Sequence, residues 1–213
     1  MMELTLIQKI AIFALPVIFA ITVHEAAHGY AARYFGDLTA YHAGRITLNP
    51  LKHIDPFGTI ILPALTIAIG GILFGWAKPV PVDFSRLRNP KKDMLWVAAA
   101  GPASNLVMAI IWALVYKYVN VVPPDFVMPL TLMAQAGIGI NIVLMVLNLL
   151  PLPPLDGGRI AVSLLPNHLA RPFSQLERYG FIILIVLLVT GLLNKILAPF
   201  ITLAYQLIST VLG

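Results

Sequence analysis

Residues 4–28 read LTLIQKIAIFALPVIFAITVHEAAH and contain the two features that decide the fold. Positions 4–23 form an apolar run of the roughly 20 residues that one membrane-spanning helix needs. No positive cluster precedes the run and no cleavage site follows it, so we expect a retained helix rather than a signal peptide. His24, Glu25 and His28 stand at its end.

Apolar stretches of similar length recur along the rest of the chain, at residues 54–75, 95–119, 127–150 and 179–200. The chain is 59% hydrophobic and 11% charged, whereas a soluble domain has about 25% charged residues. The polar connections between the stretches are too short for an appended domain. We therefore predict an all-α integral membrane fold, a polytopic helical bundle of about 4–6 transmembrane or re-entrant segments, forming a single domain over residues 1–213.

The charge and cysteine counts exclude several kinds of site. The sequence has no cysteine, which rules out disulfides, Cys-ligated zinc and thiol nucleophiles, so that His, Asp and Glu are the available metal ligands. The net charge is +5, but the basic residues gather in the polar connections without interleaved aromatic residues. We expect attraction to anionic lipid headgroups and no nucleic-acid partner.

The distribution of Lys and Arg predicts which side each connection faces. The connections at 29–53, 76–94 and 151–178 are basic, whereas 121–126 is not, so the first three are expected in the cytoplasm. Both flanks of 54–75 are then cytoplasmic, which favours a re-entrant hairpin over an ordinary spanning helix.

Proline, glycine and polar residues interrupt two of the apolar stretches. Pro63, Gly70 and Gly71 interrupt the expected hairpin. The C-terminal stretch 179–213 is expected to contain one crossing, broken near Asn194, Lys195 and Pro199, and then either a return helix or a helix lying in the interface.

The HEAAH sequence at 24–28 has the spacing of a zinc-binding helix. His24 and His28 are four positions apart and share one helical face, so both imidazoles can bind one ion while Glu25 lies beside them. The alternative is a set of interfacial residues whose polar ends reach water.

A catalytic zinc site needs a third protein ligand and an open position. The candidates are His42, His53, Asp156, His168 and Glu177. Asp156 is favoured because LNLLPLPPLDGG at 147–158 ends an apolar helix with three prolines and two glycines, which permit a sharp turn back into the bundle. The alternative role for Asp156 is a helix cap or turn residue.

The HEAAH motif on a first membrane helix, together with Asn148-Leu149-Leu150-Pro151 and Leu155-Asp156-Gly157 on a later one, resembles the site-2 protease family of intramembrane zinc metalloproteases. The resemblance implies a minimal, core-only member in which His24, His28 and Asp156 bind one zinc ion and Glu25 is the catalytic base. It also implies that Asn148 contacts the substrate or the developing oxyanion.

The sequence GPASN at 101–105 is similar to the GxxxN signature of the same family. Gly101 and Asn105 are therefore candidates for substrate contact, with Asn105 as a second candidate oxyanion donor. The alternative is that these small residues permit close packing of helices.

The activity that the resemblance implies is that of a zinc metalloendopeptidase performing regulated intramembrane proteolysis, which hydrolyses peptide bonds in or near transmembrane segments of membrane-anchored substrates. Its expected partners are a transmembrane protein substrate and the lipid bilayer. Its expected location is the cell membrane of a prokaryote, with the active site toward the cytoplasm. The oligomeric state stays open.

Two other classes remain. One is a membrane zinc protease of the prenyl-protein-processing type, for which Glu177 is the only later glutamate. The other is a non-catalytic membrane metal-binding or transport protein or an inactive scaffold, although the segments 95–119 and 179–193 carry few polar residues at mid-helix.

The alternation Arg45-Ile46-Thr47-Leu48, ended by Pro50, predicts a short β element after the first helix, with an irregular loop as the alternative. An exposed strand edge there could pair with an extended substrate. The sequence KPVPV at 78–82 is expected to be an extended linker that could line the path of the substrate.

Overall fold

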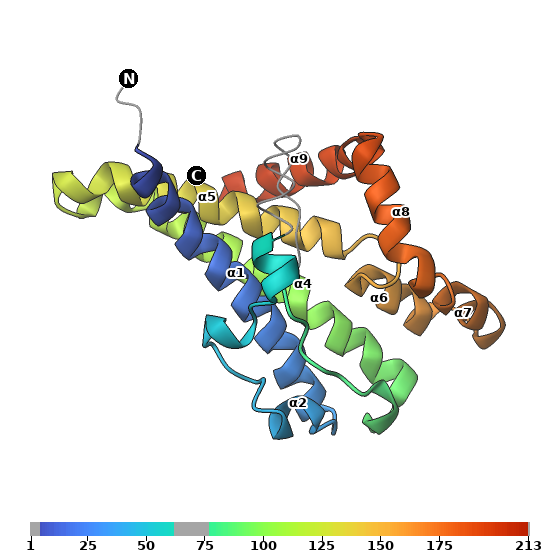
Figure 1. Cartoon of the computed structure of the whole chain (residues 1–213). Helices are drawn as coiled ribbons and strands as arrows, with labels where there is room; N and C mark the ends of the chain where they lie inside the picture. Colours follow the sequence, from blue (N-terminus) through green and yellow to red (C-terminus); the bar gives the residue numbers. More distant parts are fainter. Residues whose placement is uncertain (1–4, 62–76, 213) are drawn as a thin grey trace.

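The computed structural model describes residues 5–61 and 77–212. Four of its helices are long and apolar enough to cross a membrane: α1 (Leu6–Tyr34), α4 (Pro90–Lys117), α5 (Pro124–Asn148) and α9 (Leu192–Leu212). In Figure 1, α1, α4 and α5 run alongside one another. The predicted polytopic helical bundle is confirmed, and the chain is a multi-pass membrane protein.

Shorter elements connect these helices. They are α2 (Thr39–His42), η1 (Pro50–Lys52), η2 (Pro56–Ile61), η3 (Phe84–Arg86), η4 (Val119–Val121), α6 (Asp156–Leu164), α7 (Asn167–Ser174) and α8 (Glu177–Val189). The pair α7 and α8 is bent by 62° and would make a fifth crossing if both formed one span.

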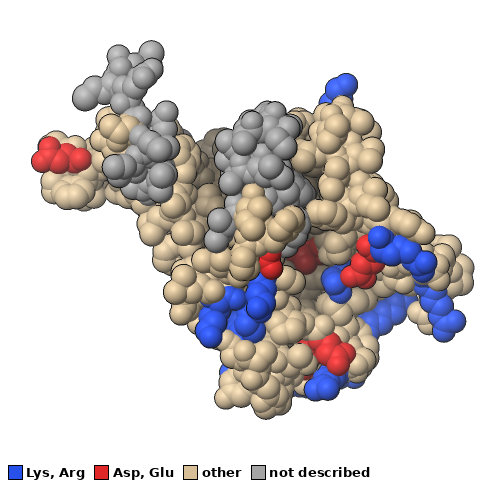
Figure 2. Space-filling view, in the orientation of Figure 1, with Lys and Arg blue, Asp and Glu red and all other residues tan. Residues whose placement is uncertain are grey.

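The sequence explains where the long helices begin. Thr5 and Gln8 form a capping box at the start of α1, in which each side chain bonds the other residue's backbone N–H. Pro90 and Pro124 stand in the first turns of α4 and α5, where the missing N–H costs nothing. In Figure 2 most Lys and Arg side chains on the visible face lie toward the end of the bundle that carries α2, α6 and α7.

The flanks of the predicted hairpin at 54–75 lie together. Lys78 N donates to His53 O at 2.9 Å, and Arg88 N donates to Phe35 O at 2.9 Å, close to the end of α1. Residues on both sides of the interval therefore lie near the end of α1 that carries HEAAH. Residues 54–61 of the predicted hairpin are described and contain η2, whereas its remaining residues, with Pro63, Gly70 and Gly71, fall outside the described residues.

The predicted β element at 45–48 is wrong, because no strand occurs in residues 5–61 or 77–212. The adjacent chain is the segment 78–82, in which Pro79 and Pro81 lack the N–H groups that a ladder needs. The Arg45 side chain donates instead to the carbonyl oxygens of Lys78 at 2.9 Å and of Pro79 at 3.2 Å. The carbonyl groups of Lys78 and Pro79 thus receive their hydrogen bonds from the Arg45 side chain and not from a neighbouring strand.

The C-terminal stretch is also divided differently from the prediction. The break falls at Gly191, whose φ of +70° suits glycine, and α9 continues through Pro199. Helix α9 belongs to the bundle, because its apolar side chains join the largest buried cluster. That cluster comprises Ala109, Ala113, Ile138, Ile142, Val146, Leu184, Leu193, Leu197, Ala204 and Ile208.

Candidate metal centre

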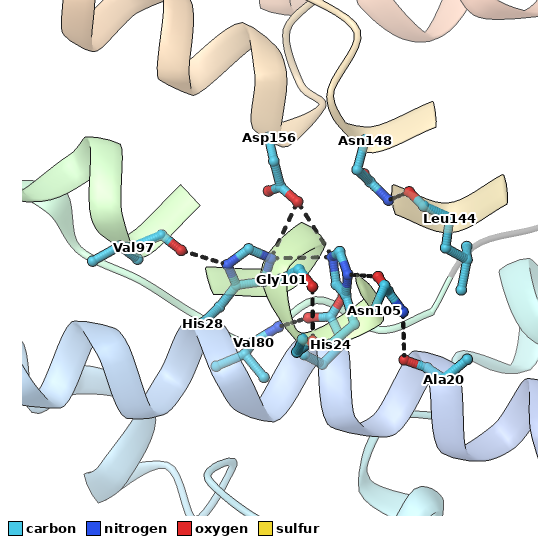
Figure 3. Close-up of polar contacts among 12 residues, drawn as sticks. Ala20, His24, His28, Val80, Val97, Gly101, Asn105, Leu144, Asn148 and Asp156 are labelled. Carbon is cyan, nitrogen blue, oxygen red and sulfur yellow. Dashed lines mark hydrogen bonds and ion pairs between the residues drawn. The ribbon is translucent and has the colours of Figure 1, made fainter. Parts of the chain in front are cut away.

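His24, His28 and Asp156 converge where α1 meets the start of α6 (Figure 3). The two Nε2 atoms of the histidines are 3.1 Å apart, and each lies 3.3 Å from Asp156 Oδ2. Their side chains are at most 13% exposed. Within the described ranges this is the one group of three His, Asp or Glu residues close enough to share a metal ion.

The spacing of these three atoms fits a zinc ion. Tetrahedral zinc with bonds of about 2.0–2.1 Å to N and O ligands separates its ligand atoms by about 3.3 Å. Asp156 Oδ2 is buried and has no hydrogen-bond partner in the described part of the chain. An unpartnered buried carboxylate oxygen facing two imidazole nitrogens indicates a place for a cation between them.

Hydrogen bonds behind the rings fix which nitrogen faces the centre. His28 Nδ1 donates to the carbonyl oxygen of Val97 at 2.8 Å, and His24 Nδ1 donates to Asn105 Oδ1 at 2.6 Å. In a neutral imidazole the other nitrogen, Nε2, then carries the lone pair. Both lone pairs point toward Asp156, as metal binding requires.

Tight packing of the 149–155 loop places Asp156 at the first position of α6. A Cβ atom on Gly157 would lie 2.3 Å from Leu149 O, and one on Gly158 would lie 2.2 Å from Pro153 N. On α8, a Cβ atom on Gly180 would lie 1.7 Å from Pro153 O. The loop can follow this course only because all three positions lack side chains.

Helix α4 closes one side of the centre at Gly101. A Cβ atom there would lie 2.4 Å from His28 Nε2 and 2.6 Å from His24 Nε2. Only glycine therefore permits α4 to approach the two imidazoles so closely.

Glu25 is half-buried beside the two histidines. Its Oε2 accepts a hydrogen bond of 2.8 Å from Val80 N, in the extended segment 77–83. Gly29, one turn after Glu25, provides the space for this segment, because a Cβ atom there would lie 3.0 Å from Ile46 and 3.2 Å from Val80. The predicted linker at 78–82 thus lies directly beside Glu25.

Asn148 and Asn105 occupy different positions around the centre. Asn148 Nδ2 donates to Leu144 O in its own helix at 3.0 Å (Figure 3). Asn105 Nδ2 donates to Ala20 O at 3.3 Å and to Asn141 Oδ1 at 2.9 Å, so both of its amide hydrogens have acceptors. Asn105 is therefore a partner of His24, with no hydrogen left for an oxyanion.

The alternative third ligands do not join the centre. His42 and His168 are exposed, and Glu177 is exposed and pairs with Arg159 at 3.2 Å. His53 is buried, and its Nε2 donates to Thr47 O at 2.9 Å.

Sequence reasoning missed some contributors. Asn141 could have been found from the sequence, because a polar amide inside an apolar membrane helix is rare without a function. The amide of Val80, the carbonyl of Val97 and the close approach of Gly180 depend on tertiary contacts, for which the sequence carries no local pattern.

The chain is similar in sequence to one protein family and to several bacterial proteins. A model described as Peptidase family M50 matches residues 124–191, which include Asp156. "Putative zinc metalloprotease YwhC" from Bacillus subtilis is 44% identical over 186 residues, covering 85% of this chain and 82% of that protein. "Putative zinc metalloprotease Rip2" from Mycolicibacterium smegmatis is 35% identical over 184 residues, covering 84% and 66%. No solved structure matches the chain.

Proposed function

Since the chain belongs to peptidase family M50, the site-2 protease family, we propose that His24, His28 and Asp156 hold the zinc ion of an intramembrane metalloprotease. The family and its relatives make the chain a zinc metalloprotease, and its apolar helices place it in a membrane. The observation that carries the residue assignment is the triangle of ligand atoms with sides of 3.1–3.3 Å.

Glu25 is the proposed general base. When bound, zinc supplies Lewis acidity, which lowers the pKa of water toward about 7 and polarises a carbonyl group. Glu25 accepts the proton of the attacking water and returns it to the leaving amine nitrogen. Because Val80 N–H holds Oε2, the other carboxylate oxygen is the one that exchanges the proton.

Asn148 is the proposed donor to the developing oxyanion. One of its amide hydrogens is bonded to Leu144 O, and in residues 5–61 and 77–212 no acceptor takes the second, which is the one proposed to meet the substrate. Gly101 permits the close packing of α4 against the two histidines, and Asn105 accepts a hydrogen bond from His24. Their proposed roles are therefore in metal binding and not in substrate contact.

The proposed substrate is a transmembrane segment of a membrane-anchored protein. Its peptide bonds are protected by i→i−4 hydrogen bonds until the helix unwinds locally, so the enzyme acts on an unwound stretch. The gathering of Lys and Arg at the end of the bundle near the centre supports a site facing the cytoplasm of a bacterial cell membrane (Figure 2).

We also infer one functional domain over residues 1–213. The metal centre draws on α1 and α6, and α4 packs against it, while the buried cluster joins α4, α5, α8 and α9. A second buried cluster of Ala32, Leu87 and Val97 joins α1 to the same α4, so these contacts support a single unit.

Cleavage of a membrane-anchored reporter by the Glu25→Gln variant tests the proposal. We expect cleavage to fall at least 1000-fold, in the range ascribed to lost proton transfer, while zinc content stays near one per chain. An unchanged cleavage rate would refute the catalytic role. A His24→Ala variant that keeps full zinc content would refute the metal site.

A further inference from the structure

Asn141 is a fully buried amide in the middle of α5 that none of the proposed chemistry uses. Its Nδ2 donates to Gly137 O at 2.8 Å, and its Oδ1 accepts from Asn105 Nδ2 at 2.9 Å. Asn105 is equally buried and contacts His24. A line of hydrogen bonds thus runs from α5 through α4 to the candidate metal ligand on α1.

The direction of every hydrogen bond in this line is fixed by two backbone carbonyl groups. Gly137 O can only accept, so the NH2 group of Asn141 faces it and Oδ1 faces Asn105. Ala20 O can only accept as well, so Asn105 presents Nδ2 to Ala20 and Asn141, and Oδ1 to His24. His24 must then donate from Nδ1 and keep its lone pair on Nε2.

The opposite orientation of the Asn105 amide would disfavour the His24 tautomer that can bind a metal. Rotation by 180° would bring its Oδ1 against Ala20 O and Asn141 Oδ1, which are both acceptors. Its NH2 group would then face His24 Nδ1 and favour the tautomer with hydrogen on Nε2, the nitrogen that faces Asp156. The contact with Ala20 O is long, at 3.3 Å, so Asn141 is the stronger of the two restraints.

We propose that Asn141 is a positioning residue that locks Asn105 and thereby holds His24 in the tautomer that binds zinc. The inference rests on the proposed metal site. It adds a residue on a third helix that touches neither metal nor substrate. Loss of a residue that hydrogen-bonds a ligand directly typically weakens metal affinity by about 10–100-fold, and the loss of Asn141 acts through such a residue, Asn105.

The test measures zinc affinity by chelator competition in detergent for Asn141→Leu, which keeps the branched arrangement of side-chain heavy atoms and cannot form side-chain hydrogen bonds. We expect an affinity at least 10-fold weaker than wild type. Ile142→Ala is the matched control, because Ile142 is the next residue and is equally buried but belongs to the apolar cluster. Its zinc affinity should stay within 2-fold of wild type even if its thermal stability falls.

A second readout separates positioning from packing. In ¹⁵N-histidine NMR of the metal-free protein at about pH 8, wild-type His24 should show hydrogen on Nδ1 alone, and Asn141→Leu should show both tautomers. Asn141→Ser provides a second variant if Asn141→Leu does not fold. Its shorter hydroxyl can bond Gly137 O without reaching Asn105, so the same mixture of tautomers is expected.

Three results would overturn the inference. The first is wild-type zinc affinity in a folded Asn141 variant. The second is a single Nδ1–H tautomer in such a variant, and the third is an equal loss of affinity in Ile142→Ala. Failure of the metal site itself is distinguishable, because His24→Ala would then retain zinc while the tautomer of His24 in wild type would still follow Asn141.

Discussion

Replacing Gly101 by alanine places a methyl group inside the candidate metal centre. The new carbon would lie 2.4 Å from His28 Nε2 and 2.6 Å from His24 Nε2, about 1 Å closer than van der Waals contact allows. Neither ring can turn away freely, because Val97 O holds His28 and Asn105 holds His24. The helices must separate instead, and the ligand atoms move with them.

The expected size of the effect follows from this displacement. Metal ligands must lie within about 0.2 Å of their ideal distances, so we expect zinc affinity to fall by about 100-fold, the upper end of the range for disturbed ligand support. At a zinc concentration 100 times the wild-type Kd, zinc stabilises the wild-type protein by about 2.7 kcal/mol. A variant that binds 100-fold more weakly gains only about 0.4 kcal/mol at the same concentration.

The assay is thermal unfolding in detergent with and without zinc, together with chelator competition. The matched control is Gly139→Ala, also within a membrane helix, whose Cβ atom would approach only the Tyr205 hydroxyl, at 3.0 Å. The Tyr205 side chain can shift to make room, so zinc should stabilise this control as much as it stabilises the wild-type protein. Full zinc affinity in a folded Gly101→Ala variant would refute the close approach of α4 to the centre.

Four further predictions concern the ligand, its loop, the break before α9 and the orientation of the chain. Asp156→Ala should lose zinc and cleavage together, and normal zinc content would contradict its role as a ligand. Gly180→Ala should weaken zinc binding at least 10-fold because its Cβ atom would meet Pro153 O at 1.7 Å. Gly191→Ala, strained at φ +70°, should lower stability by about 1 kcal/mol and leave zinc affinity unchanged. Cysteine replacing the exposed Lys92 should react only with reagents on the cytoplasmic side, and labelling from outside would overturn the proposed orientation.

Local spacing made part of the site predictable. Residues four apart on a helix share a face whatever surrounds them, so HEAAH predicted the approach of His24 and His28. The prolines and glycines of 147–158 predicted a turn that presents Asp156, and the apolar stretches predicted the bundle. These features depend on backbone geometry within one turn or one loop.

Other features depended on contacts between distant residues. The strand expected at 45–48 failed because its neighbour is interrupted by Pro79 and Pro81, and pairing depends on both chains. The sequence predicts a break near Asn194, Lys195 and Pro199, but a membrane helix can tolerate proline, and the chain turns at Gly191. The hydrogen bonds that lead from Asn141 through Asn105 to His24 join three helices, and no spacing of residues within one helix predicts them.

The packing of Gly180 against Pro153 has a consequence for biosynthesis. Translation releases the HEAAH helix long before the ribosome reaches Asp156, and Gly180 of α8, which lies against Pro153 of the 149–155 loop, is synthesised later still. The three candidate ligands can therefore come together only after most of the polypeptide has been synthesised. A candidate centre assembled in this order would stay incomplete through the early steps of membrane insertion.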